Sequence, residues 1–252
     1  MKRTAWIAAA ALLAAPSASA AVADDGPGPL GVTVVASAGR PFARVGALFG
    51  ADRAGHLAGG HFCTASVVHS PHHDLVVTAA HCLDGGDGSA LVFVPGYRDG
   101  RAPYGIWPLR RQLLPDGWAA GGDEDGDEDS DVAFGVLGPV RGREVEDVVG
   151  AYRFVAGTAV GATAVTLTGY PDAREAPVTC SNRPRAHGAG QQRLTCPGFT
   201  GGTSGSPWVN GDGEVVGVLG GHERGGTTAG VSYSVVLGRE AAALYREAAA
   251  DP

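Results

Sequence analysis

Three short motifs hold the side chains needed for nucleophilic catalysis. Ser204 lies in the glycine-rich stretch "GGTSGSPW", His81 follows an apolar run in "VVTAAHC", and Asp131 begins the apolar run "DVAFGVL". A serine hydroxyl becomes a nucleophile when an imidazole accepts its proton, and a carboxylate can hold that imidazole in the correct tautomer. Together the motifs indicate acyl transfer through a covalent serine intermediate.

Each of these residues also has an ordinary structural interpretation. Glycine and serine are common turn residues. His81 is one of eight histidines, and acidic residues of the run 123–129 precede Asp131. Runs of charge are usually solvated loops. Asp131 differs because it directly adjoins an apolar run, and the coincidence of all three motifs favours the catalytic interpretation.

The elements that must position these motifs are expected to be short strands. Runs such as "HFCTASVVHS", "ALVFVPGY" and "GVSYSVVL" are rich in β-branched residues, alternate partly with period two, and are separated by glycine, proline or acidic residues. The "NGDG" at residues 210–213 predicts a hairpin. In "GREAAALYREAAADP", a helical face is formed by Ala241, Leu244, Tyr245 and Ala248. The pattern predicts an all-β barrel or sandwich with one closing helix.

The first twenty residues predict a secretory signal peptide. Lys2 and Arg3 precede an apolar stretch that ends in the small residues "ASA" at 18–20. No later run reaches the roughly 18 apolar residues of a membrane span. We therefore expect a secreted protein with a signal peptide at 1–20, a lead segment or short propeptide at 21–44 and one domain at 45–252. The net charge of −7 argues against nucleic-acid or membrane partners.

Four cysteines in an exported chain predict two disulfides. Three pairings are possible, and Cys63 with Cys82 and Cys180 with Cys196 close the shortest loops. The chain has no Cys-x-x-Cys pair for zinc. The acidic run at 123–129 lacks the EF-hand glycine and closing glutamate. The histidines of "HSPHHD", His69, His72 and His73, could hold a metal, but we interpret this segment as an exposed turn and predict no metal and no cofactor.

The motifs "TAAHC", "DVAF" and "GTSGSP", in that order, resemble those of the chymotrypsin-like serine peptidases, particularly the secreted bacterial branch that includes glutamyl endopeptidases. The resemblance covers about residues 45–248. It implies two six-stranded antiparallel β-barrels with the active site between them and a C-terminal helix. It further implies a monomeric serine endopeptidase that acts on polypeptides without a cofactor.

The resemblance also implies a role for each site residue. Ser204 would attack the scissile carbonyl, His81 would transfer the proton, and Asp131 would hold the imidazole. The backbone N–H groups of Gly202 and Ser204 would form the oxyanion hole. The substrate-binding positions would be Gly198, Gly220, Gly221, His222 and Gly230.

Two positions depart from the family pattern. Gly198 stands where trypsin-like relatives carry an aspartate that binds basic side chains, so a basic substrate pocket is not expected. Thr203 stands where many relatives carry an aspartate that pairs with a newly freed N-terminus, so that activation switch is not expected. His222 could meet an acidic substrate side chain, although glutamyl endopeptidases carry their pocket histidine nearer Leu219.

Two other functions are compatible with parts of the pattern. A catalytically silent homologue could serve as a binding module, but all three catalytic positions are filled. An esterase of the α/β-hydrolase type requires the order serine, acid, histidine and a strand-to-helix turn at the nucleophile. The order here is histidine, aspartate, serine, and a hairpin follows the serine.

Overall fold

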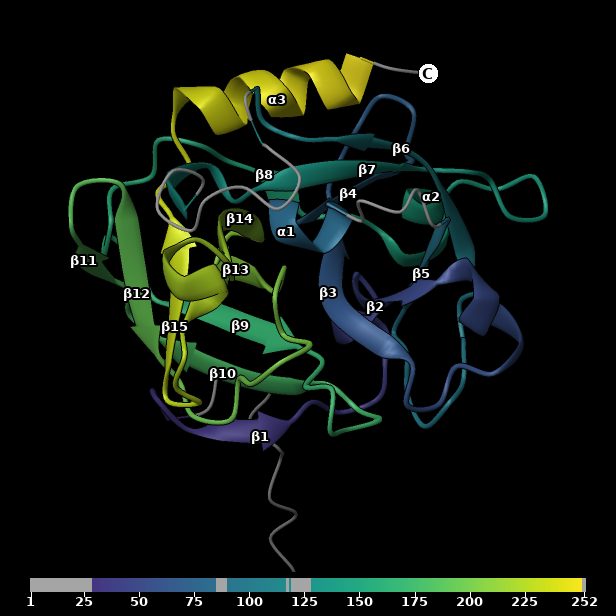
Figure 1. Ribbon diagram of the computed structural model, residues 1–252, viewed down its shortest axis with the longest axis horizontal. Coiled ribbons are helices and arrows are strands. Elements are labelled where there is room, and N and C mark those ends of the chain that lie inside the picture. The colour runs from purple at the N-terminus through teal and green to yellow at the C-terminus, as the bar shows by residue number, and fades with distance from the viewer. Residues whose placement is uncertain (1–28, 85–89, 117, 119–127, 251–252) are drawn as a thin grey trace, which may run out of the picture.

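The computed structural model describes residues 29–84, 90–116, 118 and 128–250. The predicted signal peptide at 1–20 and residues 123–127 of the acidic run lie outside these ranges. Within them, the predicted all-β fold with two barrel-like halves and a C-terminal helix is confirmed (Figure 1).

Six antiparallel strands close the first barrel, in the order β2-β3-β4-β7-β6-β5. Closure pairs every strand on both sides and so leaves no free sheet edge. The strands β2, β4, β5 and β7 are buried along nearly their whole length, which explains why they appear in the sequence as continuous apolar runs. The strands are β2 (Val45–Gly50), β3 (His61–Val67), β4 (Leu75–Thr78), β5 (Leu91–Pro95), β6 (Trp107–Leu113) and β7 (Ala133–Leu137).

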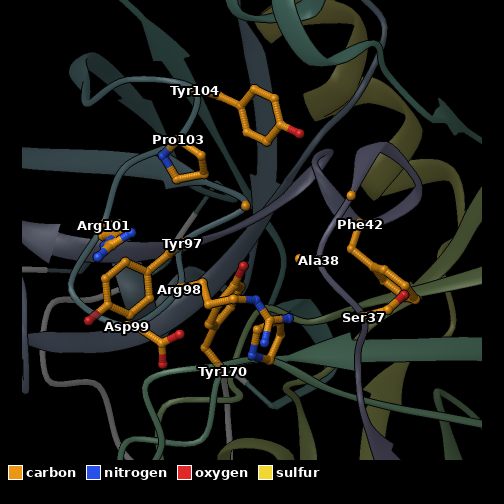
Figure 2. Close-up of a pocket in the computed structure, with 13 residues that line it drawn as sticks. Ser37, Ala38, Phe42, Tyr97, Arg98, Asp99, Arg101, Pro103, Tyr104 and Tyr170 are labelled. Atoms are coloured by element: carbon orange, nitrogen blue, oxygen red, sulfur yellow. The ribbon is translucent and has the colours of Figure 1, made fainter.

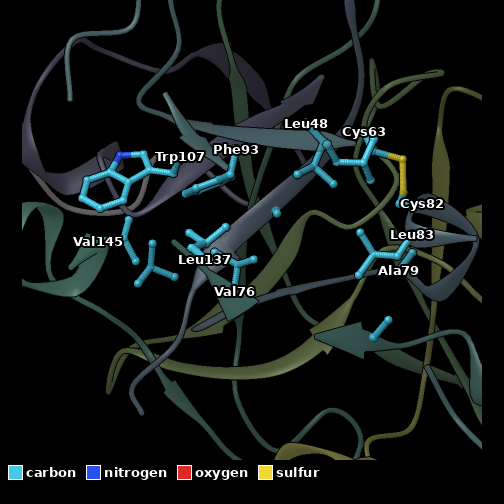
Figure 3. Packing of buried hydrophobic residues seen from close by; sticks show 14 of the residues in the cluster. Leu48, Cys63, Val76, Ala79, Cys82, Leu83, Phe93, Trp107, Leu137 and Val145 are labelled. Carbon is cyan, nitrogen blue, oxygen red and sulfur yellow. A yellow bond between two sulfur atoms is a disulfide. The ribbon is translucent and has the colours of Figure 1, made fainter. Parts of the chain in front are cut away.

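Large apolar side chains fill the first barrel (Figure 3). Leu48, Phe93 and Trp107 are almost completely buried there, and the Trp107 indole donates a hydrogen bond to Tyr104 O at 3.0 Å. The disulfide between Cys63 and Cys82 lies at one end of this core. It joins β3 to the short helix α1 (Ala80–Leu83), which carries His81.

Two sheets form the second half of the molecule. A six-stranded sheet has the order β1-β10-β9-β13-β14-β8, and a three-stranded sheet has the order β11-β12-β15. The predicted hairpin joins β13 and β14, where Asn210 Oδ1 accepts hydrogen bonds from the N–H groups of Asp212 and Glu214. The strands are β1 (Thr33–Val35), β8 (Arg153–Phe154), β9 (Val165–Gly169), β10 (Val178–Asn182), β11 (Arg185–His187), β12 (Gln191–Thr195), β13 (Pro207–Asn210), β14 (Glu214–Val218) and β15 (Val231–Val235).

Side chains join the two sheets of the second half. On one side, Val218 N donates to Ser234 Oγ at 3.0 Å and Gln192 Nε2 donates to Val216 O at 3.2 Å. On the other side, the second disulfide links Cys180 of β10 to Cys196, next to β12. Side-chain bonds and a disulfide thus close the second half where no backbone ladder runs between its sheets.

Part of the predicted lead segment is built into this half. The strand β1 pairs with β10 in the register Thr33 to Cys180, and Ala36 N donates to Pro177 O at 2.9 Å. A short 3₁₀-helix, η1 (Arg40–Phe42), then leads into β2. The domain boundary at residue 45 stays a prediction, but residues 29–44 contact the folded domain.

The C-terminal helix α3 (Arg239–Ala250) covers one end of both halves (Figure 1). Its predicted apolar face packs Ala241, Leu244 and Ala248 into a cluster with Phe134 of the first barrel and Val215 of the second half. The Tyr245 hydroxyl donates to His69 O at 2.7 Å. No helix in the described ranges is long and apolar enough to cross a membrane.

Candidate active site

Strand pairing brings His81 and Asp131 together. His81 follows β4, Asp131 precedes β7, and these two strands pair with Thr78 opposite Ala133. His81 Nδ1 lies 2.8 Å from Asp131 Oδ2. Because a carboxylate only accepts hydrogen bonds, Nδ1 is the protonated ring nitrogen and Nε2 carries the lone pair.

Asp131 accepts further hydrogen bonds from both halves of the molecule. His81 N donates to Oδ1 at 3.0 Å, and Gly221 N donates to Oδ2 at 2.7 Å. The residue is only 2% exposed, so these donors replace the water that an ionised carboxylate would lose on burial. A Cβ atom on Gly220 would lie 2.6 Å from Asp131 Oδ2, which explains why a residue without a side chain stands there.

Ser204 occupies a tight turn between positive-φ glycines. Gly202 has a φ of +84° and Gly205 a φ of +85°, a region that favours glycine. A Cβ atom on Gly202 would lie 2.6 Å from Tyr170 O. Within the described residues, the N–H groups of Gly202 and Ser204 have no hydrogen-bond acceptor. Both are available to an external oxygen.

A chain of contacts links the turn that carries Ser204 to the helix that carries His81. Ser204 O accepts a hydrogen bond from Thr64 N at 2.7 Å. Thr64 follows Cys63, whose disulfide partner Cys82 follows His81. In the described part of the chain the Ser204 hydroxyl makes no hydrogen bond to His81, which is common before substrate binds because such bonds tighten in the substrate complex.

Thr64 is a site residue that the sequence analysis missed. Its hydroxyl donates to Gly202 O at 3.0 Å and accepts from Tyr170 N at 3.0 Å, and the residue is fully buried. The hydrogen bond to Gly202 O fixes the orientation of the peptide between Gly202 and Thr203. It therefore holds this part of the turn in place. No motif in "HFCTAS" points to this role, because both partners are more than 100 residues away in the sequence.

A cavity of about 450 Å³ adjoins Ser204. Its wall is formed by the segment before Ser204, by Leu219 and by the segment that follows His222. The lining residues are Phe199, Thr200, Gly201, Thr203, Ser204, Leu219, Glu223, Arg224, Gly225, Gly226, Thr227, Thr228 and Ala229.

The residues predicted to bind substrate lie around this cavity but outside its lining. Gly198 N donates to Ala229 O at 2.6 Å, so Gly198 adjoins the lining residue Ala229. Gly220 and Gly221 lie against Asp131, and Gly230 lies beside Ala229 in the chain. The His222 ring lies 4.9 Å from the His187 ring and 4.8 Å from the Tyr233 ring, measured between centroids.

Glu128 of η3 (Glu128–Ser130) anchors the segment at the cavity rim. Its carboxylate accepts hydrogen bonds from Glu223 N at 2.7 Å and from His222 Nδ1 at 3.0 Å. Burial alone would raise the pKa of Glu128, but these two hydrogen bonds, together with the electrostatic attraction of His222 and His187, lower the pKa. They hold the 3₁₀-helix η4 (His222–Gly225), in which Glu223 and Arg224 both have positive φ values, 50° and 53°. Such backbone strain is typical of functional sites.

A second cavity, of about 430 Å³, lies between η1, the segment after β5 and Tyr170 (Figure 2). It is lined by aromatic and arginine side chains, including Tyr97, Arg98 and Tyr170. None of the predicted site residues lines it.

Comparison with known proteins agrees with this geometry. A family profile described as trypsin-like peptidase domain matches residues 63–218. The protease Anisep from Arthrobacter nicotinovorans is similar in structure, with a TM-score of 0.71 and 29% identity over 85% of this chain and 99% of that one. The thermostable serine protease AL20 from an extremophilic microorganism has a TM-score of 0.70 and 27% identity over 85% of this chain and 100% of that one.

A glutamyl endopeptidase shares the fold, with a TM-score of 0.66 and 17% identity over 89% of this chain and 99% of that one. A search of curated proteins found no match to the sequence.

The Thr64→Val variant tests the role of the Thr64 hydroxyl. Valine keeps the shape but leaves Gly202 O and Tyr170 N without their partner, and we expect kcat/KM for a peptide substrate to fall by roughly tenfold. Thr64→Ser keeps the hydroxyl and should restore most of the activity, and thermal unfolding of both variants reports any loss of stability. Equal activity of the valine and serine variants would show that the hydroxyl does not position the turn.

Proposed function

The chain belongs to the trypsin-like peptidase domain family, and on that premise we propose that it is a secreted endopeptidase that hydrolyses polypeptides through an acyl-enzyme on Ser204. The observation that carries the proposal is the pairing of His81 Nδ1 with the buried carboxylate of Asp131, beside a turn that presents Ser204 and two free N–H groups.

The geometry supports one role for each of the three residues Ser204, His81 and Asp131. Ser204 Oγ attacks the scissile carbonyl carbon while His81 Nε2 accepts the hydroxyl proton. His81 then gives this proton to the leaving amine. A water molecule next attacks the acyl-enzyme, with His81 again accepting the proton, and releases the acyl group from Ser204. Asp131 stays ionised and stabilises the imidazolium that forms between these steps.

The turn around Ser204 stabilises the developing oxyanion. The N–H groups of Gly202 and Ser204 donate to the carbonyl oxygen as it becomes negative, and each such donor contributes about 3 kcal/mol to the transition state. Thr64 keeps the Gly202 carbonyl turned away from this position, because the carbonyl is hydrogen-bonded to the Thr64 hydroxyl.

Labelling with a fluorophosphonate probe tests the nucleophile. We expect covalent labelling of Ser204, located by mass spectrometry, and its loss in the Ser204→Ala variant. Ser206→Ala is the matched control, because Ser206 Oγ is fully buried and donates to Thr203 O at 2.6 Å. A folded, processed chain that is not labelled would favour the alternative, a silent homologue that serves as a binding module.

The cavity beside Ser204 is proposed to hold the substrate side chain that precedes the scissile bond. Its charged lining residues are Glu223 and Arg224. The Glu223 carboxylate accepts a hydrogen bond from the Thr227 hydroxyl at 3.0 Å, whereas the Arg224 guanidinium has no partner within the described residues. Arg224 is therefore the group free to pair with an acidic substrate side chain.

Arg224→Gln tests this preference. With peptides that differ only in glutamate or glutamine before the cut, we expect the wild-type ratio of kcat/KM to favour glutamate and to fall by roughly fivefold in the variant, since a hydrogen bond to a charged group is lost. Arg246→Gln is the matched control, because Arg246 is an exposed arginine of α3 that does not line the cavity. A ratio that is unchanged in Arg224→Gln would remove Arg224 from the specificity pocket.

Export is proposed from the predicted signal peptide at 1–20, and the two disulfides support an oxidising compartment. Trimming after Arg40 or Arg44 would leave a chain that begins next to β2. N-terminal sequencing of the protein from the culture medium should find a first residue at or after Ala21, and an intact Met1 would contradict export with cleavage.

A further inference from the structure

We propose that the protein binds a divalent transition-metal ion such as Zn²⁺ on its first barrel through His69, His73 and Glu146. The two histidines belong to the turn between β3 and β4, and Glu146 belongs to α2 (Val145–Val149). One ligand atom from each of the three residues lies within 4.8 Å of the other two. The sequence analysis interpreted this turn as exposed. It did not connect the turn with Glu146, which lies 77 residues from His69 in the chain.

The three ligand atoms can bind one metal ion after small movements of their side chains. Zinc binds imidazole nitrogen and carboxylate oxygen at about 2.1 Å, so two of its ligand atoms are at most about 4.2 Å apart and about 3.3 Å apart in a tetrahedral site. His69 Nδ1 now donates a hydrogen bond to Glu146 Oε1 at 2.8 Å, and a metal ion that binds both atoms would replace this proton, which leaves to water, as the two atoms move apart. The histidine side chains are 55% and 42% exposed, so rotation of their rings can bring the third ligand atom in without moving the core.

The backbone already fixes the positions of the three residues. Glu146 N donates to His73 O at 3.0 Å, and His69 N donates to Tyr152 O at 2.8 Å. Ser70 N donates to Glu146 Oε2 at 3.4 Å. His73 has a φ of 61°, an unfavourable conformation for a residue with a side chain, and the surrounding bonds hold it. Little backbone conformational entropy therefore remains to be lost when a metal binds.

A carboxylate also orients one of the proposed ligands. His73 Nδ1 lies 2.8 Å from Asp147 Oδ1, so Nε2 of the neutral His73 ring carries the lone pair that a metal ion would bind. Metal-binding histidines usually donate their other ring N–H to such a group. The remaining coordination positions face solvent, which suits water ligands.

A metal ion at this site would act on stability rather than on catalysis. It would tie the β3–β4 turn to α2, and the Tyr245 hydroxyl on His69 O connects the same turn to α3. None of the three ligands lines the cavity beside Ser204 or contacts the proposed catalytic residues. The inference therefore does not depend on the proposed function.

Isothermal titration of the chelator-treated, full secreted chain with Zn²⁺ tests the site. We expect one ion to bind, with at least a tenfold weaker affinity in His73→Ala and Glu146→Gln and a roughly tenfold weaker affinity in Asp147→Asn. His72→Ala is the matched control, because His72 is an exposed histidine of the same turn outside the cluster, and its affinity should equal that of the wild type. Equal affinities of all four variants, or no binding by the wild type, would overturn the proposal.

Two further measurements separate loss of the site from loss of folding and from binding elsewhere. The melting temperature of each variant is compared with and without zinc, and the rise on adding zinc should be equal in the wild type and His72→Ala and smaller in the other three variants. In the wild type, the imidazole NMR signals of His69 and His73 should shift on titration. A shift confined to other histidines, such as His187 and His222, would place the ion elsewhere and refute the proposal.

Discussion

The buried carboxylate of Asp131 depends on donors that neither half of the molecule supplies alone. His81 of the first barrel and Gly221 of the second half both donate to it, and an ionised group this deeply buried is tolerable only when such partners are in place. Docking of the two halves and assembly of the site are therefore one event. Thr64 of the first barrel likewise donates hydrogen bonds to the carbonyl oxygens of Ser204 and Gly202 in the second half.

Glycines at the site mark places where backbone from another part of the chain approaches closely. A Cβ atom on Gly205 would lie 2.0 Å from Thr64 O, one on Gly202 would approach the Tyr170 carbonyl, and one on Gly220 would approach Asp131. The glycine-rich segment around Ser204 thus does more than relax a turn. It lets the backbone of the first barrel approach the turn around Ser204 closely enough for hydrogen bonds between them to set the geometry.

Local patterns predicted the strands, the hairpin at 210–213 and the C-terminal helix, because each depends on neighbouring residues. The cysteine count predicted two disulfides and left three pairings open, of which the structure has the one with the shortest loops. Residues that have distant partners and no motif of their own were not predictable. Thr64, Glu128 and Glu146 act through segments far along the chain, and their own surroundings in the sequence carry no signal. The strand β1 was missed because three residues, with Val34 and Val35 exposed, give too short a pattern. His222 adjoins the cavity segment in sequence, but its ring packs with His187 and Tyr233 instead.

The side-chain hydrogen bonds that join the two sheets of the second half between β14 and β15 form a seam, and this seam has a consequence for the lifetime of the protein. A peptidase is surrounded by copies of itself, and autolysis begins where a chain opens locally without unfolding as a whole. The first barrel is closed by continuous backbone ladders, whereas Ser234 and Gln192 hold this seam through their side chains. These two side chains, together with the backbone bond from Gly220 N to Tyr233 O, are thus the contacts that oppose local opening of the second half between β14 and β15.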